Sequence, residues 1–195
     1  MMRGTCCETK DRYLPPFVMD NFVRRWISSP RKKIAKFASV GSVMADIGCG
    51  PGYFTIPMAE LAGPTGKVYA ADADPKSINV LKEKTSTHGL QNILEAYITS
   101  AADMKFIPGH SVDFVFANGV LCCMVDHDGA IAEIKRILKP SGLCYLSVAT
   151  LFRKSDIRAV PKSEWEQILE GFEVKETHDG ILNRWATVRL KNQGV

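Results

Sequence analysis

The chain has 195 residues, of which 46% are hydrophobic and 24% are charged, a composition typical of a single globular domain. It is too apolar for a disordered chain, and no stretch approaches the roughly 18 uninterrupted apolar residues that a membrane helix needs. Residues 1–10 lack the apolar segment of a secretory signal. We therefore expect a cytoplasmic protein with no membrane span.

The net charge of +4 is distributed unevenly along the chain. Residues 1–42 carry nine Lys/Arg against three Asp/Glu, a net +6, and the remainder carries a net −2. We expect a basic N-terminal helical cap over residues 1–42, with short helices near 19–28 and 31–37, and a single domain over residues 43–195. The basic excess is interpreted as a solvated face, with attraction of an acidic substrate or an anionic surface as the alternative.

From residue 43 onwards, short apolar runs alternate with longer amphipathic ones. The predicted elements, in chain order, are strand 43–47, helix 53–61, strand 68–71, helix 75–87, strand 93–98, strand 112–117, helix 128–138 and strand 143–149. The Lys-Pro-Ser-Gly run at 139–142 is expected to end the last of these helices. Such alternation predicts a parallel sheet with helices on both faces.

The C-terminal part of the chain has a different pattern. After a predicted helix over 163–169, the strands 172–177 and 184–190 are joined by a connection too short for a parallel crossover. They are therefore predicted to form an antiparallel hairpin. The expected fold class is α/β, a Rossmann-like doubly wound sheet of seven strands, five parallel plus the C-terminal antiparallel hairpin.

A glycine-rich segment, Asp-Ile-Gly-Cys-Gly-Pro-Gly at 46–52, follows the first predicted strand. Glycines allow a sharp turn and close approach of a ligand, and ligands of open parallel sheets bind at this edge. A dinucleotide fingerprint needs a small third residue where this chain has Tyr53, and no P-loop Gly-Lys-Ser/Thr follows. Asp46 suits a ligand with a cationic ammonium group, and Asp72, at the end of the second strand, can accept two ribose hydroxyls.

These motifs together resemble those of the class I S-adenosylmethionine-dependent methyltransferases. The matching segments are the Asp-x-Gly-x-Gly-x-Gly motif, Val-Tyr-Ala-Ala-Asp-Ala-Asp-Pro at 68–75, and the stretches 111–115 and 133–142. The chain is most similar to the small-molecule, menaquinone-biosynthesis-like (methyltransferase type 11) subset, over about residues 40–150. The resemblance implies an enzyme that transfers a methyl group from S-adenosylmethionine to a small-molecule acceptor by in-line displacement, with S-adenosylhomocysteine as product.

The resemblance also implies a set of cofactor-binding residues. These are Asp46, Gly48, Cys49, Gly50, Gly52, Asp72, Ala73, Ala102, Asp103 and Asn118. The glycine turn would wrap the methionine half of the cofactor, with Asp46 near its ammonium group. Asp72 would bind the ribose, Ala73 would flank the adenine, and Asn118 would line the floor near the transferred methyl group.

Two positions depart from the subset's pattern. Members of the subset often carry an acidic residue just after the third strand that contacts the adenine. This chain has Ala101 at that position, so Asp103 can bind the adenine only if the loop is shifted. A histidine of the subset is replaced by Cys123. We interpret the Cys122–Cys123 pair as small buried hydrophobic residues, with a thiol pair facing the substrate as the alternative. No C-x-x-C spacing occurs among the six cysteines, so we expect free thiols and no metal.

No catalytic residue is assigned from the sequence. The candidates are His127, as a general base near the mouth of the site or else a surface residue at a helix start, and Tyr13, as part of an aromatic lid with Phe17 or else packed on the sheet. A sulfonium donor is already activated, so a base is needed only where the nucleophile must lose a proton.

The acceptor is expected to be small and acidic, because the N-terminal segment and residues 153–158 are basic. We do not expect a nucleic acid partner. Two alternatives stay open: a nucleic-acid or protein methyltransferase that uses the basic N-terminal segment, and a non-catalytic cofactor-binding protein.

Overall fold

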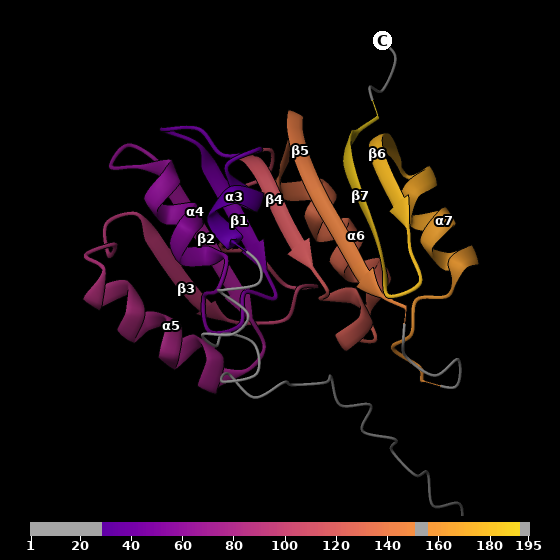
Figure 1. The fold of residues 1–195 in the computed structure, drawn as a ribbon, viewed down its shortest axis with the longest axis horizontal. Coiled ribbons are helices and arrows are strands. Elements are labelled where there is room, and N and C mark those ends of the chain that lie inside the picture. The colour runs from indigo at the N-terminus through magenta and orange to yellow at the C-terminus, as the bar shows by residue number, and fades with distance from the viewer. Residues whose placement is uncertain (1–28, 151–155, 192–195) are drawn as a thin grey trace, which may run out of the picture.

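The computed structural model describes residues 29–150 and 156–191. Within them, one seven-stranded sheet has the order β3-β2-β1-β4-β5-β7-β6 (Figure 1). The strands are β1 (Val43–Ile47), β2 (Lys67–Asp72), β3 (Leu94–Ile98), β4 (Val112–Asn118), β5 (Leu138–Ala149), β6 (Phe172–Asp179) and β7 (Asn183–Leu190). The first five pair in parallel, and β7 pairs antiparallel with both β5 and β6. The predicted fold class is confirmed.

Five helices accompany the sheet within the described ranges. They are α3 (Pro30–Ile34), α4 (Thr55–Ala62), α5 (Pro75–Thr87), α6 (His127–Ile137) and α7 (Lys162–Glu170), with a 3₁₀ turn η1 (Leu121–Cys123). In the chain, α3 precedes β1; α4, α5 and α6 connect parallel strands; and α7 lies between β5 and β6. Local sequence fixes where two of them begin. The Asp74 carboxylate accepts the N–H groups of Lys76 and Ser77 ahead of α5, and that of Asp126 accepts the Gly129 N–H in α6.

Two hydrophobic cores lie on opposite faces of the sheet. One is formed with α3, α4 and α5, and the other with α6 and α7. Successive side chains of β4 point to opposite faces of the sheet. Phe114 and Phe116 therefore belong to the first core, and Val115 and Ala117 belong to the second. This is the three-layer arrangement expected of a parallel sheet covered on both faces.

The start of β5 differs from the prediction. The 139–142 run was expected to separate a helix ending at 138 from a strand beginning at 143, but α6 ends at Ile137 and β5 already begins at Leu138. The pairing with β4 jumps from Val112–Leu138 to Phe114–Leu143, so Pro140 lies in an irregularity of the ladder. A proline there removes no ladder hydrogen bond, which is why the strand tolerates it.

Part of the sequence lies outside the described residues. This holds for the predicted helix over 19–28, the candidates Tyr13 and Phe17, and most of the predicted cap. Across the described ranges, no helix has the length and apolar character to cross a membrane, and no cluster of His, Cys, Asp and Glu is arranged to hold a metal ion.

Candidate functional site

The glycine segment forms a tight turn between β1 and α4. Gly48, Gly50 and Gly52 have φ angles of 70°, 53° and 90°, in the left-handed region that favours glycine. Space is limited as well, since a Cβ on Gly52 would lie 2.6 Å from Leu81 Cδ1 and one on Gly48 would lie 2.9 Å from Val120 Cβ. The turn therefore requires glycine for both conformation and packing.

Asp72 ties the end of β2 to this turn. Its Oδ2 accepts the N–H of Gly50 at 2.7 Å, and its Oδ1 accepts the N–H of Asp74 at 2.8 Å. Burial raises the pKa of Asp72, and these two N–H groups oppose part of that rise. Each carboxylate oxygen has a second lone pair, so Asp72 can hold the turn and still accept a ligand hydroxyl.

Asp46 is the last-but-one residue of β1 and only 3% exposed. The hydroxyl of Thr55, at the start of α4, donates to its Oδ2 at 2.6 Å. Burial raises the pKa of Asp46 to about 7, with the nearby Asp72 adding to the rise and the Thr55 hydrogen bond opposing it. A cationic group placed beside Asp46 would restore its charged form.

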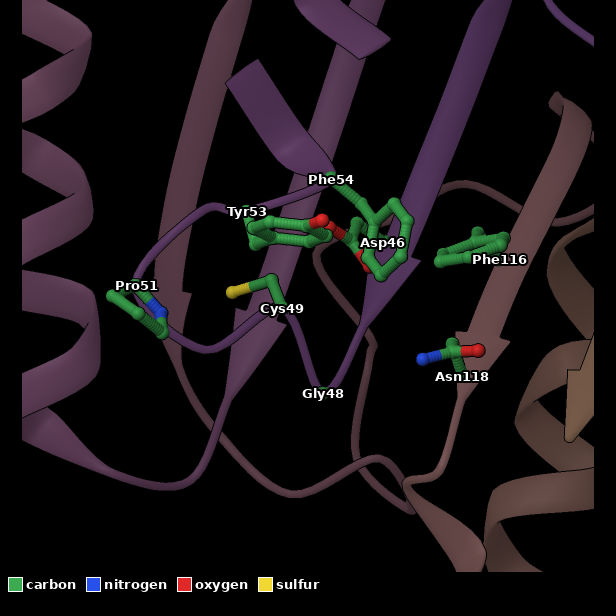
Figure 2. Close-up of a pocket in the computed structure, with 8 residues that line it drawn as sticks. All are labelled: Asp46, Gly48, Cys49, Pro51, Tyr53, Phe54, Phe116 and Asn118. Carbon is green, nitrogen blue, oxygen red and sulfur yellow. The ribbon is translucent and has the colours of Figure 1, made fainter. Parts of the chain in front are cut away.

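A pocket opens at the carboxyl ends of β1 and β4 (Figure 2). Eight residues line it: Asp46, Gly48, Cys49, Pro51, Tyr53, Phe54, Phe116 and Asn118. Four were predicted from the sequence, namely Asp46, Gly48, Cys49 and Asn118. The aromatic residues were missed, although Phe116 could have been found, since it precedes Asn118 by two positions and shares its face of β4.

Cys49 and Cys122 are buried, whereas Cys123, the second residue of the predicted buried pair, is only partly buried. Burial and the charges of Asp46 and Asp72 raise the pKa of the Cys49 thiol well above its ordinary value. Cys122 is 2% exposed and belongs to the core formed with α6 and α7. Its sulfur lies 3.3 Å from the Gly119 carbonyl oxygen. These environments match small packed residues rather than reactive thiolates.

Six predicted cofactor residues are not among the described residues that line the pocket: Gly50, Gly52, Asp72, Ala73, Ala102 and Asp103. The loop after β3 nevertheless starts beside Asp72, because the Thr99 N–H donates to the Asp72 carbonyl at 3.0 Å. Asp103 is exposed on that loop, 3.4 Å from the Lys105 ammonium, and Ala102 faces Gly129 of α6.

His127 is buried at the start of α6, not on the surface. Its Nδ1 lies 2.5 Å from a carboxylate oxygen of Glu164 in α7, and its Nε2 lies 2.8 Å from the Leu121 carbonyl and 3.0 Å from that of Met124. Both ring nitrogens face oxygen acceptors. This arrangement favours a structural link between α6, α7 and the η1 segment.

Comparisons with known proteins agree with this geometry. A family model described as a methyltransferase domain matches residues 45–146. A demethylmenaquinone methyltransferase of Geobacillus stearothermophilus is 31% identical over 115 residues, which are 58% of this chain and 48% of that protein. The chain thus spans about half the length of the curated relatives it matches.

Solved structures share the fold. A SAM-dependent methyltransferase from Aquifex aeolicus has a TM-score of 0.77 at 22% identity, covering 91% of this chain and 100% of its own. A TehB-like SAM-dependent methyltransferase from Corynebacterium glutamicum has a TM-score of 0.68 at 19% identity, covering 91% and 100%.

Proposed function

The chain belongs to the methyltransferase domain family, and from this premise we propose that it transfers a methyl group from S-adenosylmethionine to a small, acidic acceptor. S-adenosylmethionine is the cofactor of this family and fold. The acceptor's size and charge are the new parts of the proposal. The observation that carries the assignment of methyl transfer is the buried carboxylate of Asp46 at the wall of a pocket built from the glycine turn and three aromatic side chains.

The residues around this pocket fit the cofactor. A buried acid with a pKa raised to about 7 gains from a cationic partner, and the ammonium group of S-adenosylmethionine supplies one. Phe54 and Phe116 contribute apolar surface to the pocket wall. The glycine turn presents backbone to the methionine half, and Asp72 at the end of β2 accepts the ribose hydroxyls. Ala73, Ala102 and Asp103 flank the adenine in this proposal.

The reaction asks little chemistry of the protein. When bound, S-adenosylmethionine supplies an activated methyl group, so alignment of the acceptor and exclusion of water can provide most of the rate. Phe54 and Phe116 keep the reacting region apolar, and Asn118 lies at its floor. A general base is required only for an acceptor that keeps its proton, which leaves His127 free for its structural contacts.

A small acceptor is supported by the curated relatives, which are demethylmenaquinone methyltransferases. The basic N-terminal cap supports an acidic one. In this proposal, residues 1–42 cover the 43–195 domain. Two observations at the described end of the cap support it: Ile34 is fully buried, and Arg31 lies 2.7 Å from Glu60 of α4.

A cytoplasmic location belongs to the same proposal. Along the described ranges, Cys49 and Cys144 are free thiols. Free thiols are the state that a reducing compartment maintains.

The test is methyl transfer itself. Purified protein, S-adenosylmethionine and a panel of aromatic and aliphatic acids are incubated, and S-adenosylhomocysteine production is followed by mass spectrometry. We expect turnover with at least one acid and a strong loss in Asp46→Asn. Turnover only with RNA or a protein, and RNA binding that weakens steeply between 50 and 200 mM salt, would overturn the small-acceptor proposal.

A further inference from the structure

A lysine from the N-terminal side of the domain reaches the floor of the pocket. Lys33 lies on α3, 85 residues before Asn118 in the chain, and its Nζ is 3.2 Å from the Asn118 Oδ1. Asn118 ends β4 and lines the pocket beside Gly48. A positive charge thus lies next to Asn118 at the pocket, where sequence motifs gave no sign of one.

Aromatic rings fix the position of this ammonium group. The Lys33 Nζ lies 4.4 Å from the ring centre of Tyr145, 5.5 Å from that of Phe116 and 5.6 Å from that of Phe54. The rings also contact one another, with centroid separations of 4.7 Å for Phe54–Phe116 and 5.0 Å for Phe116–Tyr145. Cation–π attraction from three half-buried or buried rings holds a charge that a flexible surface lysine would not keep in place.

The same contact sets the orientation of the Asn118 amide. An ammonium group only donates, so the amide oxygen must face Lys33. The Ser147 hydroxyl donates to the same oxygen at 3.1 Å. With Oδ1 held by two donors, the NH₂ end turns the other way, and Figure 2 shows the Asn118 nitrogen on the side of the Gly48 turn. The floor of the pocket therefore presents N–H donors next to a fixed positive charge.

We infer that Lys33, through Asn118, selects a methyl acceptor that carries an anionic oxygen, such as a carboxylate, phenolate or enolate. The inference rests on the proposed function and names the substrate class of that site. An amine acceptor would meet donors and a like charge at this floor, which disfavours it. Lys33 is a positioning residue here, because it acts by orienting the amide that meets the acceptor.

With an anionic acceptor, the charges of the two reactants cancel when the methyl group is transferred. The acceptor's electron pair forms the new bond to the methyl carbon, the carbon–sulfur bond breaks, and its electron pair stays on sulfur as a neutral thioether. The negative charge of the acceptor and the positive charge of the sulfonium cancel, and no proton has to be removed. A site that binds the acceptor as an anion thus needs no general base.

The test uses two probes of equal size and opposite charge, 2-naphthoate and 2-naphthylmethylammonium. Their binding to the full chain saturated with S-adenosylhomocysteine is measured by calorimetry. We expect the carboxylate to bind and the ammonium compound not to bind. Lys33→Met should weaken binding of the carboxylate by about tenfold or more, because the Asn118 amide loses the charged donor that holds its orientation. Lys33→Arg should restore most of the affinity.

Lys32→Met is the matched control, since Lys32 lies on the same helix, is exposed and carries the same charge. It should leave carboxylate binding within twofold of wild type. Asn118→Asp provides a second test that keeps the side-chain shape, and it should abolish the preference for the carboxylate probe, because the new carboxylate pairs with Lys33 and offers no N–H donor.

The outcomes separate this inference from the proposed function. Wild-type protein that does not bind S-adenosylhomocysteine contradicts the proposed function. Protein that binds S-adenosylhomocysteine but prefers the ammonium probe, binds neither probe, or binds the carboxylate equally well in Lys33→Met overturns only the assignment of Lys33 and Asn118.

Discussion

The carboxylate of Asp72 accepts a hydrogen bond from the Gly50 N–H at 2.7 Å, joining the end of β2 to the glycine turn that follows β1. The two halves of the proposed cofactor site are thereby coupled. A ligand that gives its ribose hydroxyls to Asp72 and its methionine half to the turn would contact both ends of this bond.

Asp72→Ala should weaken S-adenosylhomocysteine binding by about 1.5–3 kcal/mol, because a charged acceptor of ribose hydroxyls is lost together with the support of Gly50. Calorimetric titration measures the change. Glu83→Ala, an exposed charge removed from α5, is the control and should leave affinity unchanged. An Asp72→Ala affinity within twofold of wild type would show that the ribose assignment is wrong.

The raised pKa of Asp46 predicts a pH-dependent affinity. The ammonium group of the cofactor favours the ionised carboxylate, and with a pKa of about 7 that form becomes scarce as the pH falls. Affinity should therefore drop by up to about tenfold for each pH unit below 7 and level off above it. Titrations from pH 5.5 to 8.5 measure this.

Two comparisons isolate Asp46 as the cause. Asp46→Asn should bind more weakly at pH 8 and lose the pH dependence. 5′-Methylthioadenosine, which has no ammonium group, should bind wild-type protein with no such dependence. If the affinity of wild-type protein for S-adenosylmethionine does not change with pH, Asp46 does not bind the ammonium group.

Glycine substitutions should distinguish backbone strain from crowding. Gly52 and Gly89 both have positive φ, 90° and 66°, but a Cβ on Gly52 meets Leu81 at 2.6 Å, whereas one on Gly89 meets nothing within 4 Å. Gly89→Ala should cost about 1 kcal/mol of unfolding free energy, and Gly52→Ala about 2–4 kcal/mol. Urea unfolding measures both, and equal losses would contradict the packing of the turn against α5.

His127 should contribute to stability through its contacts with Glu164, Leu121 and Met124. His127→Ala is expected to lower the unfolding free energy by about 2–4 kcal/mol, since it leaves a cavity and two unsatisfied carbonyls. Cofactor affinity should stay within twofold. Glu164→Gln keeps a hydrogen-bond partner for the ring and should cost less. Unchanged stability with abolished methyl transfer would instead identify His127 as the general base.

The order of elements could be predicted because it depends on local patterns. The strands β1 and β4 and the helix α5 were found within a residue of their bounds, and the short connection before β7 already required an antiparallel pair. Asp46 and Asn118 were identified for the same reason, as polar residues at the ends of apolar strands. The sequence predicts a helix breaker at Pro140, because it does not reveal that β5 leaves its pairing with β4 at that point.

What could not be predicted depends on docking between distant segments. Lys33 meets Asn118 only because α3 packs against the sheet and α4, and a basic residue in a basic segment carries no sequence signal of such a contact. The Asp72–Gly50 hydrogen bond likewise requires the relative placement of two strand ends, which the spacing of the motifs does not define.

The most direct test of the account is calorimetric binding of S-adenosylmethionine and S-adenosylhomocysteine to the freshly purified chain, with NADH as control and mass spectrometry of the denatured protein to detect cofactor carried through purification. We expect micromolar binding of both sulfur nucleosides and none of NADH. Binding of NADH, or no binding of either sulfur nucleoside by protein free of carried cofactor, would contradict it.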